Sequence, residues 1–223
     1  RLGPYPYPQV SAVDGSIAAG GGMEYPMVTI IGESPSRFVH ELTIVHEVGH
    51  NWLYGILANN ERDHPWMDEG LNSYYEASYA KEKYPKMDIS GNTLNEQIVE
   101  FLGLQKLPWT YSYRFFYLLQ ARESYDQAID LHSEEYSYVN YGAMVYAKSA
   151  MLFIYLENWL GKEKMDMLMK EYYEAWKFKH PQPDDFFNLL ATKTDSVDWI
   201  RNELIGSNAK ADYKLKNIKT IGN

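Results

Sequence analysis

The stretch from His46 to His50 constrains this chain more than any other, because it reads His-Glu-Val-Gly-His. In an α-helix, side chains four residues apart lie one above the other, so His46 and His50 can bind the same ion. Glu47 points to the neighbouring edge of that helix face, where a general base can reach a metal-bound water. The pattern predicts a metal-binding helix of the kind found in zinc peptidases, with a coordination position left open for water.

The alternative is an ordinary amphipathic helix with two exposed histidines, since so short a pattern also arises by chance. The surrounding sequence argues against that alternative. Apolar side chains recur at helical spacing through residues 36–57, from Phe38 and Leu42 to Leu53, so this helix is expected to be largely buried. Buried histidines need partners or a metal ion, which favours a metal site.

Two acidic residues further along can complete that site. Glu69 follows His50 after eighteen intervening residues, which is enough chain to finish one helix, turn, and bring the start of the next alongside the first. A carboxylate there can act as a third ligand. Glu76 lies seven residues later on the same helix face and can accept a hydrogen bond from a ligand imidazole. The alternative for Glu76 is an ordinary surface glutamate.

A glycine-rich segment precedes the predicted metal helix. Gly20, Gly21 and Gly22 stand just before a lone acidic residue, Glu24, and such a run indicates a backbone that another group approaches closely. The alternative is a flexible turn with a surface carboxylate.

Composition excludes several classes of function. The 223 residues carry a net charge of −9 and offer no basic patch, which argues against nucleic acid as a partner. Cysteine is absent, so any metal site must use His, Glu and Asp. No apolar run approaches the length of a membrane span. An acidic, cysteine-free chain suits the bacterial periplasm or exterior, and it suits a cytosol equally.

Periodicity and turn residues predict a chain that is mainly helical with a little strand. Ser34 and Pro35 predict the start of the metal helix, as its cap and its first residue. The strands are expected at residues 9–13 and 27–31, and the helices at residues 36–57, 65–83, 94–104, 112–125, 136–160, 164–177, 184–194 and 197–204.

Taken together, four motifs over residues 1–205 resemble the aminopeptidase N family of gluzincin metallopeptidases. The zinc signature of that family is similar to His46-Glu47-x-x-His50 with Glu69 after eighteen residues. Its other three motifs resemble Asp68-Glu69-Gly70-Leu71, with Asp for the usual Asn; Gly21-Gly22-Met23-Glu24-Tyr25, with Tyr for the usual Asn; and Tyr146-Ala147-Lys148-Ser149 followed by Tyr155-Leu156-Glu157.

The resemblance implies a role for each matching residue. His46, His50 and Glu69 would hold one zinc ion per chain. Glu47 would be the general base that activates the zinc-bound water, and Tyr146 would donate a hydrogen bond to the developing oxyanion.

The same resemblance implies how a peptide is held. Glu24 would bind the free α-amino group, within a motif that includes Gly22. Met23 and Tyr141 would lie near the pocket for the first side chain. Tyr25 stands where the family has Asn, so the peptide-anchoring motif is altered at this position.

The fold implied is α+β, mainly α, of the thermolysin-like type. The catalytic domain is expected over residues 1–206, with the sheet and zinc helix in 1–60 and a helical part in 61–206. Residues 207–223 are expected to form a polar tail that leads to a further domain. Family members also carry an N-terminal β-rich domain, which is expected to accompany this chain.

The function implied is zinc-dependent hydrolysis of the N-terminal bond of peptides with a free N-terminus. Two alternatives stay open: a gluzincin endopeptidase, and a non-catalytic scaffold that keeps the peptidase fold.

Overall fold

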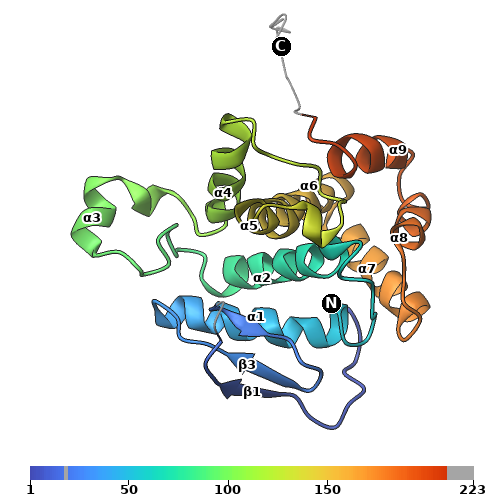
Figure 1. Cartoon of the computed structure of the whole chain (residues 1–223), viewed down its shortest axis with the longest axis horizontal. Helices are drawn as coiled ribbons and strands as arrows, with labels where there is room; N and C mark the ends of the chain where they lie inside the picture. Colours follow the sequence, from blue (N-terminus) through green and yellow to red (C-terminus); the bar gives the residue numbers. More distant parts are fainter. Residues whose placement is uncertain (18–19, 210–223) are drawn as a thin grey trace, which may run out of the picture.

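The computed structural model describes residues 1–17 and 20–209 of the chain, and it shows a small sheet on one side of a larger body of helices (Figure 1). The sheet has three strands, β1 (Ser11–Asp14), β2 (Gly22–Met23) and β3 (Val28–Ile31), in the order β1-β3-β2. The central strand β3 pairs parallel with β1 and antiparallel with β2. Strand β2 was not predicted, because two residues are too few to show a strand pattern.

Helix α1 (Arg37–Leu53) carries the His-Glu-x-x-His sequence and packs on the sheet. Its cap is Ser36 and not Ser34 as predicted, because Ser36 has the extended backbone of a cap and its side chain accepts a hydrogen bond from the Val39 amide at 3.2 Å. The helix also ends before residue 57. The amides of Tyr54 and Gly55 both donate to the His50 carbonyl, at 2.8 and 2.7 Å, which closes the last turn.

Helix α2 (Glu69–Lys83) packs between α1 and α6 (Ser149–Leu160). A short 3₁₀ turn, η1 (Pro65–Met67), leads into it and places Glu69 at its first position. The other elements are α3 (Glu96–Phe101), η2 (Leu104–Lys106), α4 (Tyr111–Arg122), η3 (Ser133–Glu135), α5 (Tyr138–Asn140), the π-helix η4 (Tyr141–Lys148), α7 (Lys162–Trp176), α8 (Pro183–Leu190), α9 (Val197–Trp199) and the π-helix η5 (Ile200–Ile205). Within residues 1–17 and 20–209, no helix is both long and apolar enough to cross a membrane.

The single helix predicted over residues 136–160 is wrong in its middle. A π-helix, η4, separates the short α5 from α6, and the Ser149 hydroxyl donates to the Met144 carbonyl at 2.9 Å across the junction. Apolar spacing does not distinguish an α-turn from a π-turn, so the π-helix could not be predicted from the sequence pattern. Such insertions re-aim side chains and often lie at functional sites.

The main core lies on the side of α2 that faces away from the sheet. Its largest fully buried side chains include Trp66, Tyr74, Phe153, Tyr172 and Phe186, from η1, α2, α6, α7 and α8. Burying side chains of this size stabilises the fold by about 1.5–3 kcal/mol each. The pair α1 and α2 is therefore fixed between this core and the sheet. Of the tail predicted at residues 207–223, residues 210–223 lie outside the described part of the chain.

Candidate metal centre and substrate cleft

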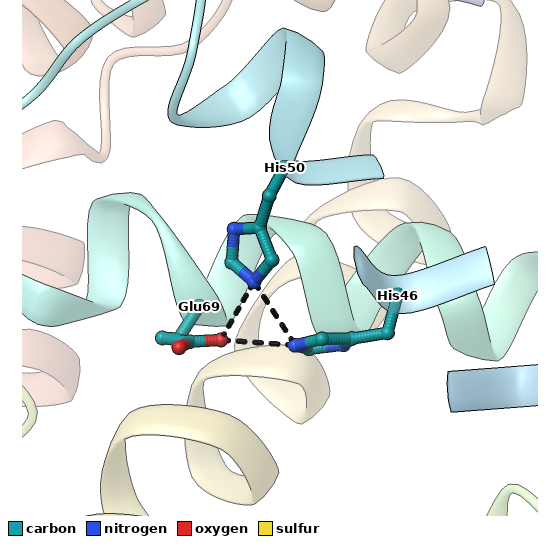
Figure 2. Close-up of side chains that lie close together, drawn as sticks. All are labelled: His46, His50 and Glu69. Atoms are coloured by element: carbon teal, nitrogen blue, oxygen red, sulfur yellow. Dashed lines mark hydrogen bonds and ion pairs between the residues drawn. The ribbon is translucent and has the colours of Figure 1, made fainter. Parts of the chain in front are cut away.

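Three predicted ligands converge on one point (Figure 2). His46 and His50 reach it from α1, and Glu69 reaches it from the start of α2. Nε2 of His46 lies 3.1 Å from Nε2 of His50 and 3.0 Å from Oε2 of Glu69, and the third side of the triangle is 3.2 Å. Zinc bonds of about 2.0–2.1 Å place the ligands of a tetrahedron about 3.3–3.4 Å apart, so this donor set fits a zinc ion.

Each imidazole is oriented by a carboxylate on its other nitrogen. Nδ1 of His46 lies 3.0 Å from Oε2 of Glu76, and Nδ1 of His50 lies 2.6 Å from Oδ1 of Asp68. Such contacts fix the ring orientation and make the ligand nitrogen more basic. The Tyr113 hydroxyl holds Glu76 in turn, at 2.8 Å.

Asp68 also contacts the candidate metal site, although the sequence pattern did not single it out as a site residue. It was noted only as a replacement for the family's Asn, yet the side chain is fully buried and faces the second metal ligand. Its position immediately before Glu69 was the available signal. Asp68 is the N-cap of α2, and α2 packs against α1, which carries His50.

Charge within this cluster shifts the pKa of several groups. Burial lowers the pKa of His46, but hydrogen bonds to Glu69 and Glu76 outweigh that effect and raise it to about 10. Burial raises the pKa of Glu69, while His50 and His46 together hold it well below its usual range. Burial raises the pKa of Glu47 to about 7, against the opposing effect of the two imidazoles.

Glu47 is held against the edge strand of the sheet. Its side chain is buried, and its Oε2 has no hydrogen-bond partner among the described residues. A β-carbon on Gly22 would lie only 2.3 Å from Cγ of Glu47. The absence of a side chain at Gly22 is therefore what leaves space for this carboxylate.

The π-helix η4 brings two tyrosines to the metal site. The Tyr146 hydroxyl donates to Oε1 of Glu69 at 2.6 Å, and its ring stacks on His46 with centroids 5.8 Å apart. The Tyr141 ring meets the Tyr146 ring edge-on at 5.9 Å. Burial and the neighbouring Glu69 raise the pKa of Tyr146 well above its usual value, so the phenol keeps its proton as a hydrogen-bond donor.

A cleft of about 460 Å³ is lined by all ten candidate site residues predicted from the sequence. Glu24, just after β2, is 9% exposed and faces this cleft. The structure places in its lining the predicted Gly22, Met23, Glu24, His46, Glu47, His50, Glu69, Glu76, Tyr141 and Tyr146. The lining also includes Glu61 and Trp109, which the sequence did not single out. Tyr25 is 53% exposed and does not line the cleft.

Comparison with known proteins assigns the chain. Residues 3–204 match the Peptidase family M1 domain. The chain belongs to peptidase family M1. The resemblance inferred from four motifs is confirmed, and the sequence is that of a peptidase domain.

Several relatives of this M1 domain are named aminopeptidases. Leucine aminopeptidase 2 of Kluyveromyces lactis is 27% identical over 193 residues, which cover 80% of this chain and 27% of the relative. Aminopeptidase M1-B of Oryza sativa subsp. japonica is 22% identical over 199 residues, covering 84% of this chain and 21% of the relative. The M1 domain thus spans about a quarter of the length of these relatives.

Solved structures confirm the predicted fold class. The M1 zinc metallopeptidase of Deinococcus radiodurans superposes with a TM-score of 0.68 at 16% identity, over 98% of this M1 domain and 44% of that chain. Native yeast LTA4 hydrolase gives the same TM-score and identity, over 96% of this domain and 34% of that chain. The fold is mainly α with a small sheet, as expected.

Proposed function

We propose that this M1 domain is the catalytic part of a zinc-dependent aminopeptidase, which hydrolyses the first bond of peptides with a free N-terminus. One observation carries the proposal: a three-ligand metal set, a buried carboxylate and a half-buried phenol all face one cleft. When bound, zinc would act as a Lewis acid toward the peptide carbonyl and lower the pKa of a water molecule.

Glu47 is assigned as the general base. It takes the proton of the attacking water and returns it to the leaving amine. Its place supports this role, because it lines the cleft next to His46 and His50 and no described residue occupies its Oε2. Gly22, which has no side chain, leaves free the space that the carboxylate occupies there.

Tyr146 is assigned as the donor to the oxyanion that forms when water attacks the carbonyl. Its phenol lies beside the ligand set and bonds to Glu69. A donor placed before the reaction stabilises developing charge without reorganisation at the moment of attack.

Glu24 is assigned as the anion that receives the α-ammonium of the peptide. The side chain is nine-tenths buried and faces the cleft, and the described residues supply it with no hydrogen bond or ion pair. Such a charge favours a cationic ligand over a neutral one. Cleavage is then limited to the first residue, because an internal bond brings no ammonium with it.

Two peptides of identical sequence, one free and one acetylated at the N-terminus, test the proposal with zinc-loaded protein and mass detection of products. Stepwise shortening of the free peptide only is expected. Internal cuts in both peptides would replace the proposal with an endopeptidase. The matched control is Glu47→Gln, which should keep zinc but lose about 10²–10⁴-fold in turnover; intact turnover in that variant would remove the general-base assignment.

A further inference from the structure

A second group of acids lies beside the metal triad. Glu24, Glu61 and Asp68 each offer a carboxylate oxygen, and the three oxygens lie within 4.8 Å of one another. They come from three separate segments: the end of β2, the loop after α1, and the cap of α2. Glu24 and Glu61 line the cleft, and Asp68 is buried beneath it.

Of these three carboxylates, only Asp68 has a hydrogen-bond or ion-pair partner among the described residues, since its Oδ1 lies 2.6 Å from Nδ1 of His50. Glu24 is nine-tenths buried without a hydrogen bond or ion pair there, and Oδ2 of Asp68 is buried with no hydrogen-bond partner. The described residues that line the cleft include no Lys or Arg. Arg62 follows Glu61 but is exposed. Glu24 and Glu61 thus lie close together and partly desolvated without a positive partner among the described residues, which is unfavourable unless a cation joins them.

The spacing of the oxygens fits a primary ammonium. Three atoms mutually within 4.8 Å share a point that lies within about 2.8 Å of each, which is the length of a charge-assisted N–H···O hydrogen bond. A primary ammonium has three N–H donors for three such acceptors. Calcium, by contrast, takes six to eight oxygens, so three carboxylates fill only part of its shell.

We infer that Glu61 is a second anionic anchor for the α-ammonium of the substrate, facing Glu24 across the amine while Asp68 adds negative charge from below. The inference rests on the proposed aminopeptidase function. It means that this domain supplies more than one charge to the amine from its own residues. Nothing in the sequence pattern marks Glu61, which stands in a polar loop.

Hydrogen bonds hold the loop backbone on both sides of Glu61 before a ligand arrives. Oδ1 of Asn60 accepts hydrogen bonds from the amides of Arg62 and Asp63, at 3.1 and 3.2 Å. The Ser133 amide donates to the Arg62 carbonyl at 2.8 Å and ties the loop to η3. A loop backbone ordered in this way loses little further freedom when its side chain binds a ligand.

Calorimetric binding to the zinc-loaded full chain tests the inference. The Glu47→Gln background keeps peptides intact, and the ligands are a free tripeptide and its acetylated form. The free peptide should bind more tightly than the acetylated one. Adding Glu61→Gln should weaken the free peptide by about ten- to one-hundredfold, since one charged hydrogen bond is lost, and should leave the acetylated peptide unchanged.

Two further variants and one thermal-unfolding measurement sharpen the result. Glu33→Gln removes the same charge at an exposed position outside the cleft and should change neither affinity. Glu61→Asp keeps the charge and should restore part of the affinity. The Glu61→Gln protein should unfold at the same temperature as its parent or higher, because it loses repulsion; a lower temperature would indicate a structural role and count against the inference.

The outcomes separate the two proposals. A free-peptide preference that survives Glu61→Gln undiminished overturns the role of Glu61 and leaves the aminopeptidase proposal standing. No preference for the free peptide in the parent overturns both. Calcium binding that Glu61→Gln abolishes, with peptide affinity unchanged, would make the cluster a metal site and overturn the ammonium assignment.

Discussion

Replacing Gly22 by alanine should impair catalysis by moving Glu47 and nothing else. The new methyl group would lie 2.3 Å from Cγ and 2.4 Å from Cδ and Oε1 of Glu47, whereas ordinary contacts begin at 3.4 Å. The carboxylate must therefore retreat by about 1 Å, a displacement that costs about a hundredfold in rate when it misplaces a reacting group. That factor corresponds to about 2.7 kcal/mol of transition-state stabilisation. The backbone itself accepts alanine, since Gly22 is not among the glycines with positive φ.

The assay is kcat on a free-amino peptide, with zinc content measured on the same samples. The matched control is Gly15→Ala, whose β-carbon would meet Cγ2 of Ile30 at 2.5 Å on the same sheet, away from the cleft. We expect full zinc in both variants and a loss of turnover in Gly22→Ala alone. Equal losses would trace the effect to sheet distortion. A Gly22→Ala enzyme with normal kcat would refute the claim that this contact positions Glu47.

Three other perturbations address separate parts of the molecule. Tyr146→Phe should lower kcat by about 10²–10³-fold with little change in KM, and an effect on KM alone would contradict the oxyanion role. Asp68→Asn removes the charged partner of His50 and should weaken zinc binding by about ten- to one-hundredfold in competition with a chelator; unchanged affinity would deny that partner any influence on the metal. Hydrogen bonds from Lys83, then from Tyr79 and Tyr84, lower the pKa of Glu41 from 4.5 to about 2. Because the folded pKa is the lower one, this stabilisation is present above pH 4.5 and is lost as the pH falls toward 2. Glu41→Gln should thus flatten the acid side of the urea-unfolding profile, modestly because the pair is partly exposed, and profiles that stay parallel would show that Glu41 does not contribute.

The sequence predicted the parts of the site that depend on local periodicity. The i, i+4 spacing of His46 and His50 fixes two nitrogens on one helix face wherever that helix lies. The eighteen residues between His50 and Glu69 are enough for the chain to finish one helix, turn, and bring the start of the next helix alongside the first. They are too few for most other chain paths between these two residues. These three residues do converge, and Glu76 does meet an imidazole. Their chemical roles stay predictions until they are measured.

The features that the sequence could not predict depend on contacts that form only when distant segments come together in the folded chain. Glu61 lies in a polar loop with no periodicity, and its place beside Glu24 follows from how that loop is tied to residue 133. The π-helix shares its apolar pattern with an α-helix, so the register that aims Tyr146 at Glu69 was hidden. The cap of α1 was misplaced by two residues because Ser34 and Ser36 flank the same proline and both suit a cap.

Asp68 belongs to two charge systems at once. Its carboxylate orients the imidazole of His50, and it is also one corner of the acidic group with Glu24 and Glu61. In the proposed complex, the ammonium partly neutralises Asp68, whose negative charge also makes His50 a stronger metal ligand. Amine binding and metal binding therefore oppose each other. Thermodynamic linkage makes that opposition reciprocal, with the same factor in both directions. A peptide with a blocked terminus lacks this coupling, so zinc retention in the presence of ligand would depend on whether the ligand carries a free amine.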